Sequence, residues 1–168
     1  MVVLNVYRRT RQSLAVCGVA LAALAGCAAE PKAPSPEQVA LFEQPVDAEL
    51  VVVAARNAMR YETLRVEAPE GATVRLVMDN RTTTSPAMVH NVVVLDGLGD
   101  IDRVGQAAAR APDNIPDDDA IRVYTPLTGP GEQTAVVFTM PPAGEYPFIC
   151  TWPGHYTQMQ GVLVSTPR

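Results

Sequence analysis

Three side chains that bind soft metals lie close together near the C-terminal end of the sequence. Cys150, His155 and Met159 offer a thiolate, an imidazole and a thioether, with four residues between the first two and three between the last two. Pro153 and Gly154 favour a turn between the Cys and the His. This spacing predicts a short loop whose side chains converge on one metal ion.

The ligand types indicate which metal. Zinc in proteins is bound by Cys, His and carboxylate ligands, so the thioether of Met159 argues against zinc. A second imidazole is available from His90, and the chain has only two His. One Cys and two His in a plane, with a weak axial Met, are the ligands of a blue-copper electron-transfer site. The sequence therefore predicts a single copper ion that cycles between Cu(II) and Cu(I).

Two neighbours of these ligands are expected to orient them. Asn91 directly follows His90 and can hydrogen-bond to the loop that begins at Thr151, as outer partners of metal ligands commonly do. A solvated side chain is the alternative for Asn91, and core packing is the ordinary explanation of a lone His or Met. The combination of both His with the unpaired Cys150 favours a metal site over these alternatives.

The first part of the sequence predicts export and lipidation. Arg8, Arg9 and Arg11 precede an apolar run over 14–24, which is too short to span a membrane and is typical of a secretory signal peptide. The run ends in Leu-Ala-Gly before Cys27, which resembles a lipobox, so Cys27 is expected to become the lipidated first residue. Ordinary cleavage with an incidental Cys is the alternative, and the Arg pair leaves twin-arginine export as a second route.

The chain is accordingly divided into three parts. A signal peptide covers 1–26, a lipidated Cys and a Pro/Ala-rich tether cover 27–47, and a single domain covers 48–168. Within the tether, Pro31, Pro34 and Pro36 favour an extended, semi-rigid spacer that separates the domain from the membrane surface. A short helical turn over 39–42 is the alternative for the end of this tether.

The cysteines and the net charge narrow the function further. Cys17 lies in the segment to be removed and Cys27 would carry lipid, so Cys150 has no disulfide partner in an oxidising compartment. From Cys27 onward the chain holds 10 basic and 18 acidic residues, a formal net charge of −8. This charge disfavours nucleic acid as a partner and is compatible with a basic protein. Neither an acid–base pair nor a pocket for a small-molecule substrate is implied, so no enzyme is predicted.

Short apolar segments separated by turn residues predict an all-β domain. Their number and spacing favour an antiparallel sandwich. One helix is predicted over 100–110, where three Ala follow one another. His90 is expected to begin a strand and Cys150 to end one, so that strand ends bring the ligands together. The predicted strands cover 49–54, 64–67, 73–78, 90–95, 121–124, 134–139, 145–150 and 160–165.

These motifs resemble the azurin and auracyanin branch of the cupredoxins. The run Cys-Thr-Trp-Pro-Gly-His over 150–155, followed by Met159, is similar to the azurin ligand loop, and Met-Val-His-Asn over 88–91 is similar to the motif of its first His. The resemblance covers 49–166 and implies a cupredoxin-like Greek-key β-sandwich of about eight strands with one short helix inserted. Further similarities to family segments lie at 59–61, 116–118 and 129–132.

The details of the resemblance separate this chain from other copper proteins. Plastocyanin-like and amicyanin-like proteins have a shorter gap between Cys and His, and copper nitrite reductases have a longer gap and a second copper domain. The azurin disulfide pair is absent, which moves the chain toward auracyanin-like relatives and suits a lipid anchor. Azurins have Gly where this chain has Val89, whose backbone carbonyl corresponds to a second weak axial group.

The resemblance also implies where the electron leaves. In azurins, the His of the Cys loop reaches the surface through an apolar patch on which redox partners dock. The same is expected here for His155, with transient docking of a donor and an acceptor to a monomer. For Met88 and Trp152, core packing is the alternative. The expected patch consists of Met59, Met88, Trp152, Pro153, Gly154 and His155.

Together these features predict a type 1 (blue) copper protein that carries single electrons between redox proteins. It is expected to be exported to the periplasm or another extracytoplasmic location and to be anchored to the membrane by lipid. One alternative is a periplasmic copper-binding or chaperone lipoprotein without an electron-transfer role, which would need an exchangeable site. Another is a metal-free binding module that keeps the fold with an inert Cys150.

Overall fold

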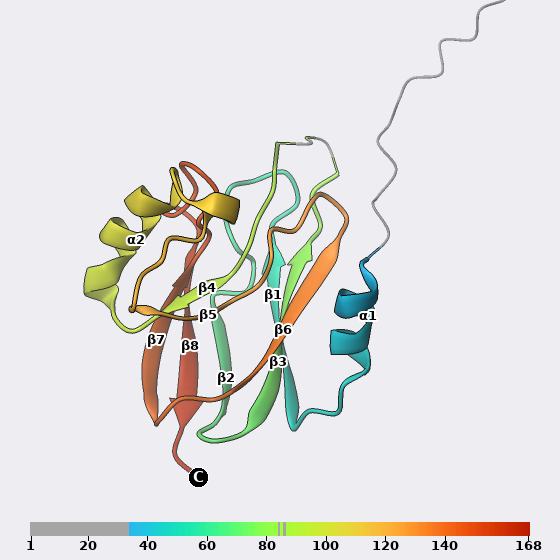
Figure 1. Cartoon of the computed structure of the whole chain (residues 1–168), viewed down its shortest axis with the longest axis vertical. Helices are drawn as coiled ribbons and strands as arrows, with labels where there is room; N and C mark the ends of the chain where they lie inside the picture. Colours follow the sequence, from blue (N-terminus) through green and yellow to red (C-terminus); the bar gives the residue numbers. More distant parts are fainter. Residues whose placement is uncertain (1–33, 84, 86) are drawn as a thin grey trace, which may run out of the picture.

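The computed structural model describes residues 34–83, 85 and 87–168, and in that part the chain folds into two packed β-sheets (Figure 1). The smaller sheet has the strand order β1-β3-β6, and the larger has the order β2-β8-β7-β4-β5. The predicted all-β sandwich of about eight strands is confirmed. The strands are β1 (Ala48–Ala54), β2 (Arg65–Pro69), β3 (Thr73–Asn80), β4 (Val93–Leu95), β5 (Ile121–Tyr124), β6 (Gln133–Thr139), β7 (Gly144–Ile149) and β8 (Gln160–Thr166).

The helices lie on opposite sides of the sandwich. Figure 1 shows α1 (Pro36–Glu43) beside the smaller sheet and α2 (Ile101–Ala108) beside β7 of the larger sheet. Two 3-10 turns, η1 (Leu98–Asp100) and η2 (Pro112–Asn114), flank α2, so the predicted helix over 100–110 is confirmed. No helix in the described residues is long and apolar enough to cross a membrane. The predicted signal peptide 1–26, the lipidation residue Cys27 and the first part of the predicted tether lie outside the described residues.

Two strand pairs differ from the antiparallel expectation. β1 pairs with β3 in parallel, and β2 pairs with β8 in parallel. β1 and β3 are parallel because the chain crosses to the other sheet at β2 between them and so returns to the smaller sheet in the same direction. The other pairs, including the β7–β8 pair that flanks the ligand loop, are antiparallel.

In the larger sheet, β4 and the end of β7 are buried on both faces, which holds these strand ends firmly. On β4, Val94 belongs to the main core between the sheets, whereas Val93 belongs to a second cluster beneath α2. On β7, Phe148 and Ile149 divide between the same two clusters. This follows from the two-residue period of a strand, which sends successive side chains to opposite faces. α2 therefore covers the outer face of the strands that precede and follow the predicted ligands.

The strand predicted over 90–95 begins later than expected. Only Val93–Leu95 is strand, and His90 instead forms an isolated bridge with Thr128, with N···O distances of 3.1 Å from His90 and 2.7 Å from Thr128. The backbone N–H of Val92 donates to the hydroxyl of Thr125 at 3.0 Å rather than to a strand. Next to His90, an isolated bridge and one side-chain partner thus replace regular strand pairing.

The prediction of an extended spacer is wrong for residues 36–43, which form the helix α1. Ser35 caps the helix by accepting from the N–H of Gln38 at 3.2 Å, and Pro36 stands in the first turn, where its missing N–H costs nothing. No residue of α1 is buried. The helix is held to the sandwich by polar contacts instead, which come from β3 and β6.

Those contacts bind side chains to backbone groups. The amide of Gln38 accepts from the N–H of Ala135 at 2.7 Å and donates to its carbonyl at 3.3 Å. The guanidinium of Arg75 donates to the carbonyl of Leu41 at 2.8 Å and to that of Gln44. It also pairs with Glu49 at 2.8 Å. The last carbonyls of α1 are thereby satisfied by a buried cation.

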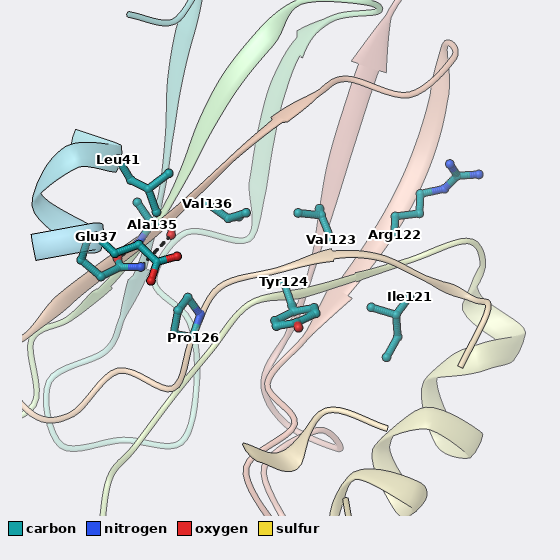
Figure 2. Close-up of a pocket in the computed structure, with 10 residues that line it drawn as sticks. Glu37, Leu41, Ile121, Arg122, Val123, Tyr124, Pro126, Ala135 and Val136 are labelled. Atoms are coloured by element: carbon teal, nitrogen blue, oxygen red, sulfur yellow. Dashed lines mark hydrogen bonds between the residues drawn. The ribbon is translucent and has the colours of Figure 1, made fainter. Parts of the chain in front are cut away.

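A pocket of about 400 Å³ opens between α1, β5 and β6 (Figure 2). Leu41, Val123, Tyr124 and Val136 contribute apolar walls, and the Gln38–Ala135 contact lies at its side. None of the predicted metal ligands lines this pocket. It is therefore separate from the chemistry predicted from the sequence.

Candidate metal centre

The predicted ligands converge at one end of the larger sheet. Cys150 directly follows β7, and the chain then turns through 151–159 into β8 at the upper end of the sandwich in Figure 1. His90 lies just before β4, which is the neighbour of β7, with Val93 opposite Ile149. His90 and Cys150 are sixty residues apart in sequence, but they therefore lie next to neighbouring strands of the sheet.

Three ligand atoms form a small triangle. The Sγ of Cys150 lies 3.8 Å from the Nδ1 of His90 and 3.7 Å from the Nδ1 of His155, and the two Nδ1 atoms are 3.2 Å apart. A point equidistant from these atoms lies about 2 Å from each, the length of a metal–nitrogen bond in protein sites. All three residues are buried. The donor set and its size therefore fit a single metal ion.

Burial sets the protonation states that a metal would meet. It raises the pKa of the Cys150 thiol to about 11, although hydrogen bonds with the backbone at Asn91 and Trp152 act in the opposite direction. Burial, with a smaller effect from His155, lowers the pKa of His90 to about 4. Burial also lowers the pKa of His155. Near pH 7 both imidazoles are neutral and able to bind metal, and metal binding would release the thiol proton.

Met159 closes the loop beside the triangle. Its side chain is fully buried and belongs to the same core cluster as Cys150. Its backbone N–H donates to the carbonyl of His155 at 2.9 Å, and its carbonyl accepts from the N–H of Cys150 at 3.1 Å. The two sulfur residues are thus paired through the backbone where β7 ends and β8 begins.

A tight turn places His155 over the cluster. Gly154 has φ of 84°, a backbone conformation that other residues adopt only with strain. The N–H of His155 donates to the carbonyl of Trp152 at 3.0 Å across this turn. The Pro-Gly pair in the sequence therefore has the turning role predicted for it.

Asn91 joins the His90 segment to the Cys loop. Its side-chain amide donates to the Thr151 hydroxyl at 2.8 Å and accepts from the Thr151 N–H at 2.9 Å. Both residues are fully buried, so both bonds are shielded from water. These are the contacts expected from the sequence, and they tie together the two segments that carry His90 and Cys150.

Two further residues support the site and were missed in the sequence. Asn80 is fully buried and donates to the carbonyls of Met88 and Thr128 at 2.8 and 2.9 Å, which fixes the backbone before His90 and that of its bridge partner Thr128. Tyr61 is also buried, and its hydroxyl donates to the carbonyl of Asn91. The sequence offers no signal for Asn80, which reads as an ordinary loop residue. Tyr61 lies in the segment 59–61, for which only a similarity to a family segment was noted above.

One polar atom at the site has no partner. The Nε2 of His90 is buried and accepts or donates no hydrogen bond within the described part of the chain. The Nδ1 of the same ring faces the cluster. The His90 ring is therefore oriented by packing and by the cluster itself, and Nδ1 is the nitrogen placed to bind a metal.

The expected docking patch is only partly exposed. Met59 is 37 % exposed, and Pro153 and Gly154 are exposed. His90 is 0 % exposed and His155 is 5 % exposed, so His155 is the imidazole that approaches the surface. The remaining residues of the region, Met88, Val89 and Trp152, are half-buried, and Trp152 packs against the main core.

The fold and the site define the class of protein as a type 1 copper protein. A model of the copper-binding proteins of the plastocyanin/azurin family matches residues 48–165, and the chain belongs to this family. The predicted azurin/auracyanin type of cupredoxin, with copper as its cofactor, is thereby confirmed.

The chain is also similar to individual proteins. Auracyanin-A of Chloroflexus aurantiacus is 34 % identical over 125 residues, which cover 71 % of this chain and 74 % of the relative. Outer membrane protein H.8 of Neisseria gonorrhoeae is 29 % identical over 175 residues, covering 88 % of this chain and 94 % of the relative. The crystal structure of dithionite-reduced auracyanin from Roseiflexus castenholzii matches with a TM-score of 0.64 and 30 % identity, covering 71 % of this chain and 97 % of that one.

Proposed function

We propose that this protein is a one-electron carrier whose copper is bound by Cys150, His90 and His155, with Met159 as a weak axial ligand. The observation that carries the proposal is the buried triangle of Sγ and two Nδ1 atoms with sides of 3.2 to 3.8 Å. Copper bound there supplies a couple between Cu(II) and Cu(I). The carbonyl of Val89 is proposed as a second weak axial group.

The residues around the ligands keep the site rigid, as electron transfer requires. Asn91 and Thr151 join the two ligand segments, and Gly154 sets the turn that brings in His155. Because Asn91 and Thr151 are buried and hydrogen-bonded, the ligands can change little in position between the two oxidation states. His155, with its small exposed edge, is the proposed exit for the electron.

The proposed docking surface surrounds that edge. Of the residues proposed for it, Met59, Pro153 and Gly154 are exposed, and Met88 and Trp152 are half-buried. A small apolar patch favours brief contact with a redox protein, and the net negative charge of the mature chain favours a basic partner. No catalytic role is proposed for any residue.

The proposed location is the periplasm or another extracytoplasmic compartment, with the protein anchored to a membrane by lipid at Cys27. The basic and apolar start of the sequence and the Cys after Leu-Ala-Gly support this proposal. The similarity to a protein named as an outer membrane protein also supports it. Because residues 36–43 form α1 and are held to the sandwich, they do not contribute to the tether, which shortens the proposed reach from the membrane.

The test is the visible spectrum of the chain from Ala28 onward with Cu(II) added, alongside Cys150→Ser. An intense blue band, with one copper per chain, that is bleached by reductant and restored by oxidant is expected for the unaltered chain. The band should be absent in Cys150→Ser, because the thiolate-to-copper transition needs the sulfur. A colourless unaltered chain would rule the proposal out.

Repeated redox cycles separate the electron carrier from the copper chaperone. The complete burial of Cys150 and His90 disfavours a site that exchanges its metal. Copper is therefore expected to stay bound through many cycles in the presence of a copper chelator. Loss of copper to the chelator at each reduction would favour the chaperone.

A further inference from the structure

The copper-ligand loop touches α2 at a close contact that requires a glycine. The ring of Tyr156 lies against Gly105, where an added Cβ would be only 2.3 Å from the Cγ of the ring and 2.5 Å from its Cδ2. Gly105 is buried in α2 and has ordinary helical backbone geometry, so the helix itself does not require glycine. Glycine is among the least favourable residues in a helix interior. Room for the Tyr156 ring explains its presence there.

Tyr156 and the ligand His155 are adjacent in sequence and lie in different environments. His155 contributes its Nδ1 to the ligand triangle. Tyr156 packs against the second hydrophobic cluster, which includes Val93 and Ile149 on the outer face of the larger sheet. The loop therefore passes over the end of the sheet and is anchored on both sides of it.

The loop is held on the inner side of the sheet by hydrogen bonds and on the outer side by packing of the Tyr156 ring against Gly105. On the inner side, Asn91 holds Thr151 through two hydrogen bonds. The His155 ring is hydrogen-bonded only within the ligand triangle in the described part of the chain. Its orientation consequently depends on the backbone between Gly154 and Tyr156. Across this short span, displacement of the Tyr156 ring is transmitted directly to His155.

We infer that Gly105 and Tyr156 are positioning residues that set the orientation of His155 and thereby the reduction potential of the copper. The inference rests on the proposed function, because it requires His155 to be a copper ligand. Imidazole nitrogen is a harder donor than sulfur and suits Cu(II), whereas thiolate and thioether favour Cu(I). A His155 ring moved from its place stabilises Cu(II) less, so the midpoint potential rises.

The test compares Gly105→Ala with Gln106→Ala in the copper-loaded chain. Gln106 is exposed on the same helix, so its substitution controls for the change in helix propensity without touching the ring. For Gly105→Ala we expect one copper per chain, a blue band changed in position or intensity, and a raised midpoint potential. Gln106→Ala should match the unaltered protein in all three. An unchanged spectrum and potential in Gly105→Ala would overturn the inference.

A double variant shows whether the effect passes through the ring. In Tyr156→Ala the ring is gone, so adding Gly105→Ala should change the potential no further, since the Cβ then fills empty space. A shift of the same size in both backgrounds would overturn the inference. Tyr156→Phe keeps the ring and should leave the spectrum unaltered. If Gly105→Ala does not fold, Tyr156→Ala alone decides, and an unaltered potential there contradicts the inference.

The same experiment distinguishes the two proposals. A blue band in the unaltered chain and in Gln106→Ala supports the proposed function whatever Gly105→Ala does. If the band is absent from the unaltered chain as well, the proposed function fails and this inference fails with it.

Discussion

The ligand loop over 150–159 and the helix α1 are both short segments whose positions depend on the sandwich, but they are attached in different ways. The loop buries Cys150 and Met159 completely, and His155 is 5 % exposed. α1 buries no residue at all. Burial and satisfied polar groups therefore fix the loop, whereas α1 relies on polar contacts at the edge of a sheet.

Asn91 and Gln38 allow a direct comparison of the two regions, because each uses its side-chain amide for two hydrogen bonds to one residue. Asn91 bonds to Thr151 through both its oxygen and its nitrogen, at 2.9 and 2.8 Å. Gln38 does the same with the backbone of Ala135, at 2.7 and 3.3 Å. The first pair is buried and the second is part-buried. Water can replace the partners of the second pair when it breaks, so the same chemistry stabilises the two regions to different extents.

Acid is expected to have the largest effect, and it acts on the site. Unfolding releases His90 from burial, so its pKa returns from about 4 toward its ordinary value of 6.5. A depressed pKa contributes stability that is present above pH 6.5 and is lost as the pH falls toward 4. For the copper-free protein this amounts to about 3 kcal/mol from His90, and His155 adds in the same direction.

Urea unfolding of the copper-free chain between pH 7 and pH 4 measures this effect. His90→Gln is the control, because it removes one of the two imidazoles and should flatten the pH dependence. The free energy of unfolding of the copper-loaded chain should also depend less on pH, since the metal keeps the imidazoles unprotonated. Equal free energies of unfolding at pH 7 and pH 4.5 in the copper-free chain would contradict the prediction.

Asn91→Ala should have the next largest effect. It leaves the buried N–H and hydroxyl of Thr151 without partners, which costs about 2 to 3 kcal/mol in the free energy of unfolding. The blue band and the midpoint potential should change too, because the two ligand segments are no longer joined. Thr151→Val removes only the hydroxyl bond and should fall between Asn91→Ala and the unaltered chain. A loss of stability with no spectral change would show that Asn91 supports the fold and not the site.

Arg75→Leu tests the other region. It removes the donors to the carbonyls of Leu41 and Gln44, so α1 should detach from the sandwich at a cost of about 2 kcal/mol. Hydrogen exchange of the α1 amides should become fast, while the copper spectrum stays as it was. Arg65→Leu, at an exposed ion pair on the other sheet, is the control and should leave α1 protected. A changed spectrum in Arg75→Leu would mean that the two regions are coupled.

Gln38→Leu should have the smallest effect. The N–H and carbonyl of Ala135 lie at the edge of the sheet and can bond to water instead, so the loss should be about 1 kcal/mol or less. Thermal unfolding of Gln38→Leu beside Gln38→Glu measures it, since Glu keeps the acceptor for the Ala135 N–H. A loss as large as that of Asn91→Ala would remove the distinction between the two amides.

Much of the fold and the centre of the site follow from local features of the sequence. Strand segments such as Ile121–Tyr124 were predicted with their observed bounds, because alternation of apolar residues and turn residues is a local property. The same holds for Gly154, whose positive φ fits the turn predicted from Pro-Gly. α1 is a case where a local signal was present and was outweighed, since Ser35 and Pro36 mark a helix start as well as a spacer.

The sequence by itself determined the set of donor atoms, the positions of most strands along the chain and the turn that returns His155 toward Cys150. Only the tertiary structure decided that Asn80 and Tyr61 brace the first ligand, that Arg75 holds α1, and that two strand pairs are parallel. The contact of Gly105 with Tyr156 belongs to the same group. Ligand types and spacings are carried by adjacent residues, whereas these contacts depend on sheet register and on which faces are buried, and no short stretch of sequence encodes either.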